Sequence, residues 1–396
     1  MSSTLGTSSP RIALVCSWLN QYGGAERVLE TLHGMYPDAP IYTSMYDPKA
    51  MPASFRTWDI RTSFLQRLPL SRSHHQLYLS LYPLAFEQFD LSGYDLIVNN
   101  SSAFSYGVLT RPETCHVCYC LTPARFLWNY HDYARREALG RLARLALAPA
   151  LTSLRIWDAQ AARRVDHFVA ISRLVASRIS KYYGRQAPVI YPSIDVSAFE
   201  PAARDDIGDY YLVVSRLVPY KRIDLAVGAF KRLGLPLKIV GGGRDRAALQ
   251  RMAGPNVEFL GRVGDADLRT LLARCRAFIF PGEEDFGLTP LEAQASGRPV
   301  IAYGAGGALE TVVEGETGVF FRQASAEALA DTVAGFRPDG WDPVAIRRHA
   351  AGFDHSVFRR QLAGFVARAL GQPEAAPRPD GRAGADVPTA GGTRWS

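Results

Sequence analysis

Two basic residues in the second half of the chain have the type and spacing to hold a diphosphate. Arg216 and Lys221 lie in residues 215–222, directly after an apolar run that we interpret as a strand, and Pro219 stiffens the segment between them. Two separated cations at a strand end can grip both phosphates of a nucleotide diphosphate through charge-assisted hydrogen bonds, each contributing about 1.5 to 3 kcal/mol. They would also favour the charge that develops on a leaving diphosphate. The structural alternative for this segment is a solvated basic loop.

A pair of carboxylates further along the chain suits hydroxyl ligands. Glu284 and Glu292, separated by seven residues, follow the apolar run and Pro-Gly turn of residues 278–282. Carboxylate oxygens accept hydrogen bonds from sugar hydroxyls, and a helix N-terminus beside them favours an anion. We expect that helix to begin with Thr289 as N-cap, Pro290 in the first turn and Glu292 as the capping-box residue. A bond from Glu292 back to the N–H of Thr289 is its structural alternative.

Glycine turns mark further candidate sites. Residues 23–26 read Gly-Gly-Ala-Glu and open a predicted helix from Arg27 onward, so the backbone around Gly24 offers a second anion site. For the glycine turns at residues 241–243 and 306–307, a tight turn and a ligand contact are both open interpretations. None of these segments reads G-x-G-x-x-G after the first strand, which argues against a nicotinamide dehydrogenase.

Short β-branched runs recur along the chain, each closed by glycine or small polar residues and followed by a helical pattern. This rhythm is typical of a parallel sheet covered on both faces. The sequence therefore predicts an α/β protein with two Rossmann-like, doubly wound parallel sheets facing a cleft, with ligands at the carboxyl ends of the strands. The predicted strands are residues 12–15, 96–98, 116–119 and 168–171 in a first series, and 211–214, 237–240, 257–260, 277–280 and 299–302 in a second.

Segments without helical or strand periodicity set the predicted domain bounds. Proline, glycine and acidic residues cluster between the two series of strands, and the last residues are dense in Pro, Gly, Ala and Arg. The predicted organisation is a flexible N-terminus (1–10), an N-terminal Rossmann-like domain (11–190), a linker (191–209), a C-terminal Rossmann-like domain (210–352), a C-terminal helix that packs back toward the N-terminal domain (353–371) and a disordered tail (372–396).

Composition bounds the class of partner and the compartment. With 47% hydrophobic and 21% charged residues the chain is typical of folded proteins, and its formal net charge of +7 favours anionic partners. No aromatic-studded basic face or reading motif supports nucleic acid. The five cysteines, an odd number, fit a reducing cytosol, and neither a signal peptide nor a membrane-spanning segment is evident. We expect a cytoplasmic protein, at most peripheral on a membrane.

Two motifs resemble metal ligands and are interpreted otherwise. Cys115, His116 and Cys118 have no second Cys/His pair at ligand spacing, so we interpret them as buried strand residues. Asp265 and Asp267 form a D-x-D pair before an apolar helical pattern, where an N-cap with an acidic first turn explains them. The sequence thus predicts no metal and no other cofactor.

The order of these motifs resembles glycosyltransferase family 4, the retaining enzymes of GT-B architecture with two Rossmann domains. The resemblance rests on Gly-Gly-Ala-Glu at residues 23–26, Ser-Arg-Leu-x-Pro-x-Lys-Arg at residues 215–222 and Glu-x7-Glu after strand-Pro-Gly, and it covers residues 11–370. It implies that the N-terminal domain binds the acceptor and the C-terminal domain binds a nucleotide diphosphate sugar.

The resemblance also assigns roles to residues. Arg216 and Lys221 would hold the diphosphate, Glu292 the ribose and Glu284 the transferred sugar, while Arg262 and Val263 would line the base pocket. The implied donor-binding set is Gly24, Arg216, Lys221, Arg262, Val263, Glu284, Phe286, Gly287, Leu288, Thr289 and Glu292.

One position departs from the family pattern. Leu121 stands where many members carry a histidine, so the group that orients donor sugar and acceptor is open, with Arg125, His116 and His131 as candidates. The implied catalytic set is Glu284, Arg216, Lys221 and Arg125. Retention of configuration is implied by the family. An internal return, in which the leaving phosphate helps to deprotonate the acceptor, would need no enzymatic nucleophile.

The acceptor has no readable code. Residues 18–26 and 123–128 resemble bacterial polysaccharide and O-antigen mannosyltransferases, which suggests GDP-mannose as donor, a lipid-linked or oligosaccharide acceptor and a place on the inner face of the cell membrane. An apolar segment at residues 64–84 and a basic Ala/Leu-rich stretch interrupted by Pro149 fit a membrane surface, and a solvated helix face is equally open. The stretch carries Arg135, Arg136, Arg141, Arg144, Arg155, Arg163 and Arg164. Alternatives on the same fold are a non-catalytic nucleotide-sugar-binding scaffold and a nucleotide-sugar hydrolase or epimerase.

Overall fold

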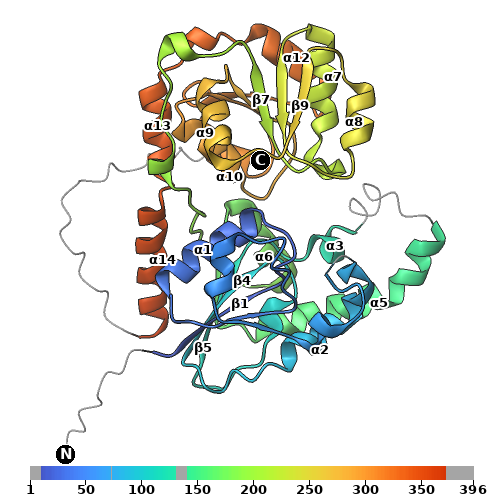
Figure 1. Cartoon of the computed structure of the whole chain (residues 1–396). Helices are drawn as coiled ribbons and strands as arrows, with labels where there is room; N and C mark the ends of the chain where they lie inside the picture. Colours follow the sequence, from blue (N-terminus) through green and yellow to red (C-terminus); the bar gives the residue numbers. More distant parts are fainter. Residues whose placement is uncertain (1–9, 73, 131–140, 372–396) are drawn as a thin grey trace, which may run out of the picture.

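Two parallel six-stranded sheets stand one above the other in the computed structural model (Figure 1). The structure describes residues 10–72, 74–130 and 141–371, with the backbone alone for residues 141–146. The expected flexible N-terminus, except residue 10, and the expected disordered tail lie outside these ranges. The strand order is β3-β2-β1-β4-β5-β6 in the first sheet and β12-β11-β10-β7-β8-β9 in the second. Each order is that of a Rossmann sheet, which confirms the predicted fold class.

The N-terminal sheet is assembled from short strands with helices on both faces. Its strands are β1 (Ile12–Cys16), β2 (Ile41–Thr43), β3 (Ile60–Thr62), β4 (Leu96–Ser101), β5 (Cys115–Cys120) and β6 (His167–Ala170). The α-helices are α1 (Gly24–Met35), α2 (Tyr82–Glu87), α3 (Arg125–Trp128), α5 (Arg141–Arg163) and α6 (Arg173–Tyr183), and the 3-10 turns are η1 (Ala53–Thr57), η2 (Phe64–Arg67), η3 (His75–Leu81) and η4 (Ser105–Gly107).

The C-terminal sheet repeats this plan. Its strands are β7 (Tyr211–Val214), β8 (Leu237–Val240), β9 (Val257–Gly261), β10 (Phe278–Phe280), β11 (Val300–Tyr303) and β12 (Gly318–Phe321). The α-helices are α7 (Ile223–Leu233), α8 (Arg246–Met252), α9 (Asp265–Arg274), α10 (Leu288–Ala295), α11 (Ala308–Thr311), α12 (Ala326–Gly335), α13 (Pro343–Ala351) and α14 (His355–Ala369). The remaining 3-10 turns are η5 (Val196–Ala198), η6 (Arg204–Asp206), η7 (Pro219–Lys221) and η8 (Pro338–Gly340).

The central strands are buried on both faces, as the near-continuous apolar runs predicted. Every residue of β4 and β10 is buried, and in β5 only Cys115 is partly exposed. The sequence analysis did not predict β2, β3 and β12, which have three, three and four residues. The expected interruption of the Ala/Leu-rich stretch at Pro149 is wrong, because α5 continues through this residue. Leu151 and Leu154 of α5 are buried in the N-terminal core.

The C-terminal helix lies beside the first sheet. Figure 1 shows α14 beside the N-terminal sheet, while the preceding α13 lies against the C-terminal one. The ring of Phe358 in α14 meets that of Tyr119 in β5 edge to face at 5.4 Å. The predicted domain bounds themselves stay a prediction.

Candidate donor site between the two sheets

The two sheets present their ligand-binding edges to each other. In a doubly wound sheet the strand order reverses between two neighbouring strands, and ligands bind at the carboxyl ends there. The reversal falls between β1 and β4 in the first sheet and between β7 and β10 in the second. Figure 1 shows α1 and α10, which follow β1 and β10, at the facing ends of the two sheets.

The two predicted diphosphate cations lie in the β7–α7 connection at this edge. Lys221 forms an ion pair with Glu284, and both side chains are largely buried. Arg216 donates to Gln21 Oε1 of the N-terminal half at 2.8 Å and to the hydroxyl of Tyr220. The predicted cations and the first predicted carboxylate are therefore together, each already balanced by a neighbour.

Arg125 lies at the same place, although it comes from the other sheet. It begins α3 beyond the carboxyl end of β5, and its Nε donates to Asp285 at 2.9 Å. Arg178 of α6 pairs with the same carboxylate. Asp285 is 9% exposed and directly follows Glu284. The guanidinium of Arg125 also lies 6.0 Å from the ring of Tyr220, which Arg216 and Lys221 approach as well.

The predicted start of the α10 helix is wrong. The N-cap is Gly287, whose φ of 98° ends the loop in a conformation that glycine adopts readily, so Thr289 is already helical. Glu292 is then too far into the helix to bond back to the cap. Its buried carboxylate instead forms an ion pair with Arg27 of α1, and burial raises the pKa of Glu292. Glu292 therefore joins the two halves of the chain.

Further contacts connect the two sheets. The carboxylate of Glu310 in α11 accepts hydrogen bonds from the backbone N–H groups of Arg173 and Leu174, at 2.8 and 3.3 Å, in the first turn of α6. A Cβ on Gly24 would lie 3.7 Å from Leu288 Cδ1, so the N-termini of α1 and α10 are in close approach. Ion pairs, helix ends and apolar contacts thus hold the cleft together.

The glycine turns prove to be close-approach positions. A Cβ on Gly241, where φ is 124°, would lie 1.9 Å from the carbonyl oxygen of Ser215, at the start of the segment that carries Arg216. A Cβ on Gly307 would lie 2.2 Å from the Cα of Phe286, next to Glu284 and Asp285. The backbone of these turns therefore packs closely against the loops that carry the site residues, which favours the tight-turn interpretation.

The predicted base-pocket residues lie in the β9–α9 connection. Arg262 is exposed and Val263 is half-buried against the core. The helix after them begins at Asp265 with Gly264 as N-cap, so the expected N-cap role of the D-x-D pair is wrong by one residue, while its acidic first turn is confirmed. Within the described ranges no three His, Cys, Asp or Glu side chains group as metal ligands, and the cysteines are free thiols.

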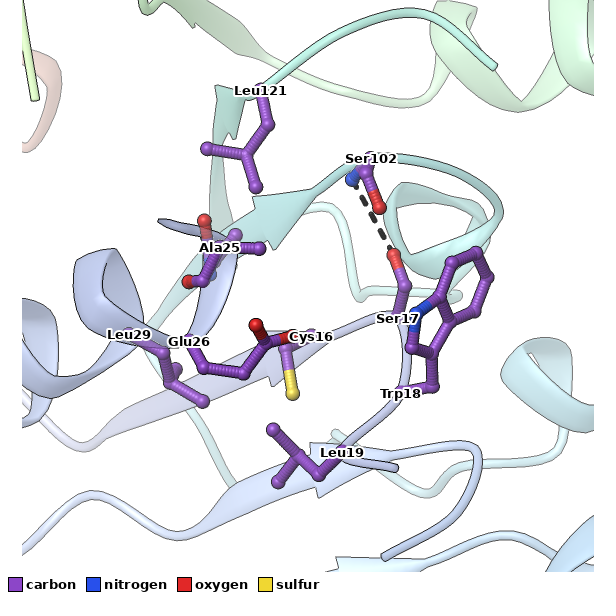
Figure 2. A pocket seen from close by; sticks show the side chains of 10 residues that line it. Cys16, Ser17, Trp18, Leu19, Ala25, Glu26, Leu29, Ser102 and Leu121 are labelled. Carbon is purple, nitrogen blue, oxygen red and sulfur yellow. Dashed lines mark hydrogen bonds between the residues drawn. The ribbon is translucent and has the colours of Figure 1, made fainter. Parts of the chain in front are cut away.

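The candidates for the missing histidine lie in different places. Leu121 directly follows β5 and lines a pocket between α1 and the ends of β1 and β4, which Figure 2 shows. His116 is five residues earlier, so it lies roughly 16 Å away along the strand, fully buried, and burial lowers its pKa to about 4. His131 lies outside the described residues. Of the two candidates among the described residues, Arg125 is the one that lies at the cleft.

Sequence reasoning missed the partners of the predicted residues. Asp285, Arg178, Arg27 and Tyr220 hold the candidate site together, and none was singled out. Asp285 and Arg27 directly follow Glu284 and Glu26 in the sequence, and this adjacency could have pointed to them. Nothing in the sequence pointed to Arg178, because its partner Asp285 is 107 residues away.

Two facing Rossmann sheets with a cationic and carboxylate-lined cleft define the GT-B class of fold. Among solved structures the Anabaena protein HepE in complex with UDP-glucose is similar, with a TM-score of 0.66 and 18% identity over 90% of this chain and 99% of that one. Sucrose-phosphate synthase from Thermosynechococcus elongatus has a TM-score of 0.69 and 17% identity over 91% and 99%. At such identity the likeness shows the fold alone.

Sequence comparison gives the family. Residues 22–198 match Glycosyltransferase Family 4 and residues 198–348 match Glycosyl transferases group 1. A GDP-mannose-dependent alpha-mannosyltransferase of Mycolicibacterium smegmatis is 33% identical over 271 residues, 63% of this chain and 67% of the relative. The chain belongs to the group 1, family 4 glycosyltransferases. A GDP-mannose-dependent alpha-(1-6)-phosphatidylinositol monomannoside mannosyltransferase of Mycobacterium tuberculosis is 33% identical over 43% of this chain and 52% of its own length, so the chain spans about half of that relative.

Proposed function

We propose that the protein transfers a hexosyl unit from a nucleotide diphosphate sugar to a lipid-linked or oligosaccharide acceptor of the cell envelope. The observation that carries the proposal is the convergence of Arg216, Lys221 and Glu284 at the reversal point of the C-terminal sheet. Two cations and a carboxylate there match the two ends of such a donor, which carries a diphosphate at one end and sugar hydroxyls at the other.

We propose GDP-mannose as the first donor to test. Mycobacterial relatives are named as GDP-mannose-dependent mannosyltransferases, whereas HepE, which is similar in fold only, was solved with UDP-glucose. Arg262 and Val263 lie on the β9–α9 connection and would meet the base. Guanine and uracil present different donors and acceptors, so this connection would decide between the two nucleotides.

The ion pairs of the cleft define what the donor must displace. Lys221 is neutralised by Glu284 and Arg216 is held by Gln21, so the incoming diphosphate would compete with a carboxylate and an amide. Binding then frees Glu284 for the sugar while both cations turn to the phosphates. As the bond to the sugar breaks, negative charge grows on the leaving diphosphate, and these preorganised cations stabilise it more than the ground state. The leaving phosphate can take the acceptor proton, with retention of configuration.

We also propose contact with a membrane surface. Leu77, Leu81 and Leu84 are 71%, 37% and 47% exposed along η3 and α2, and Arg67 and Arg72 are exposed nearby in the sequence. Apolar side chains with flanking cations suit an anionic bilayer surface. In the parts of the chain that the structure describes, no helix is both long and apolar enough to cross a bilayer. Sedimentation with anionic and neutral vesicles tests this, and equal binding to both, or unchanged binding of Leu77→Asp, would contradict it.

A donor and acceptor screen tests the proposal. The protein is incubated with GDP-mannose, UDP-glucose and related donors together with polyprenyl-linked and oligosaccharide acceptors, and nucleotide diphosphate and glycosylated product are both followed. We expect one donor to give both products in equal amounts. Nucleotide release without a glycosylated product would instead support the hydrolase, and binding without turnover would support the scaffold.

A further inference from the structure

The pocket beside Leu121 lies at the reversal point of the N-terminal sheet. It is lined by the ends of β1, β4 and β5 and by the first turns of α1. Its lining residues are Cys16, Ser17, Trp18, Leu19, Ala25, Glu26, Leu29, Asn100, Ser102 and Leu121. Figure 2 shows the side chains of Glu26 and Leu121 on the wall of this pocket, with the indole of Trp18 on the side of Ser17. The pocket is thus the N-terminal counterpart of the donor edge.

The polar capacity left open in this pocket is that of hydrogen-bond acceptors. The Nδ2 of Asn100 donates to the carbonyl of Ala25 at 2.8 Å, which fixes the amide orientation, and its buried Oδ1 has no partner among the described residues. Asn100 is 3% exposed and Glu26 is 5% exposed. Ser17, by contrast, donates to the carbonyl of Ala103 at 2.7 Å and accepts from backbone N–H groups. A ligand group that meets Asn100 Oδ1 must therefore bring a donor.

The size of the pocket restricts that group. The cavity measures about 10 Å³, which is room for a single water-sized group. Leu121 contributes only an apolar wall, and the half-buried indole of Trp18 packs against the rings of His75 and Tyr82, with centroids 5.0 and 5.9 Å away. One hydroxyl group fits these conditions, whereas a phosphate is too large and would meet the carboxylate of Glu26.

We propose that one hydroxyl of a sugar or polyol bound in the cleft shares its single O–H hydrogen between Asn100 Oδ1 and the carboxyl group of Glu26, and that this bifurcated hydrogen bond fixes its position. The proposal rests on the proposed glycosyl transfer. It would supply polar groups beside Leu121, where many family members carry a histidine, because Glu26 comes from α1 and Asn100 from β4. Glu26 also has a structural task, since backbone N–H groups of Gly23 and Glu26 stabilise its charge at the start of α1. A test must separate these two roles.

The experiment compares Glu26→Gln and Asn100→Leu with a matched control, Glu30→Gln, one turn further along the same helix. The Glu30 carboxylate accepts from Tyr22 and does not line the pocket. Steady-state kinetics are measured with donor and acceptor varied in turn, and again with deoxy analogues that lack one hydroxyl. We expect KM for one of the two substrates to rise about 10-fold in either pocket variant and to stay unchanged in the control. The affected substrate identifies the source of the hydroxyl.

The deoxy analogues separate recognition from folding. Removal of the recognised hydroxyl should weaken wild-type turnover about 10-fold and weaken Glu26→Gln less, because that variant keeps only the acceptor of Asn100. Should Asn100→Leu not fold, Glu26→Gln carries the test, because its amide oxygen can still serve the helix terminus. Kinetics of Glu26→Gln equal to wild type with both substrates, or equal losses on every deoxy analogue in both proteins, would overturn the proposal.

Binding separates this proposal from the proposed function. Calorimetry measures how much more tightly the protein binds each intact nucleotide sugar than the free nucleotide diphosphate, and how tightly it binds each acceptor. Absence of turnover in wild type with every pair would refute the glycosyl transfer alone. The role of the pocket would then be tested by binding alone. Weaker binding of a sugar-bearing ligand to Glu26→Gln, with nucleotide diphosphate binding unchanged, would support it, and unchanged binding of both would refute it.

Discussion

Asp285 supports a quantitative prediction, because one carboxylate holds two arginines of the other half of the chain. Asp285→Asn keeps the shape of the side chain but removes the charge that faces Arg125 and Arg178. Removing one partner of a fully buried ion pair lowers the free energy of unfolding by about 3 to 5 kcal/mol, whereas a surface pair contributes only about 0 to 1 kcal/mol. The side chain of Asp285 is 11% exposed and those of the two arginines 34% and 20%, so solvent screens the pairs in part. We expect Asp285→Asn to lower the free energy of unfolding by about 2 kcal/mol.

Thermal and urea unfolding measure this loss, with Asp339→Asn as the matched control. Asp339 pairs with Arg204 at 3.3 Å, but the two side chains are 84% and 79% exposed, and this pair should contribute under about 0.5 kcal/mol. Raising the salt concentration should reduce the difference in stability between wild type and Asp285→Asn only modestly, because salt screens partly buried ion pairs less than exposed ones. If Asp285→Asn proves as stable as Asp339→Asn, the ion pairs across the cleft do not stabilise the fold, and the reasoning is refuted.

Three further changes have defined outcomes. Asp158→Asn should lower the free energy of unfolding by about 3 kcal/mol in urea, since its buried carboxylate accepts from Tyr106, Tyr183 and Trp128; a loss under about 1 kcal/mol would contradict this. Gly307→Ala should raise the donor KM and lower the unfolding temperature, because its Cβ would meet the backbone beside Glu284. Burial raises the pKa of Glu26 to about 7 and thus penalises its charged form, so the contribution of Glu26 to the free energy of unfolding should fall as pH rises from about 4.5 to 7; unfolding of wild type and Glu26→Gln across this range should differ by that contribution, and parallel pH profiles would contradict it.

The sequence predicted those parts of the molecule whose signals are local. The apolar runs at the central strands, followed by helical patterns, sufficed for two doubly wound sheets. The spacing of Arg216, Lys221 and Glu284 sufficed to bring them together at one edge, because strand ends of a parallel sheet meet there. The glycine turns were found as well, although the sequence left their role open.

Long-range contacts decided what the sequence could not. Thr289 and Glu292 have the spacing of a capping box, but the positive φ of Gly287 starts the helix earlier and Arg27 from the other sheet takes the carboxylate. Asp285 was passed over because both of its arginines are more than a hundred residues away. Such partners become visible only when the two sheets are placed face to face.

Transfer activity of variants at the donor edge is the most direct test of the proposed glycosyl transfer. Purified wild-type protein, the single variants Arg216→Ala, Lys221→Ala and Glu284→Ala, and the surface control Arg204→Ala are assayed together for nucleotide diphosphate release and glycosylated product. We expect product from wild type and the control, and a loss of activity of at least about 100-fold in each site variant with folding intact. Wild-type rates in a protein carrying all three site substitutions would contradict it.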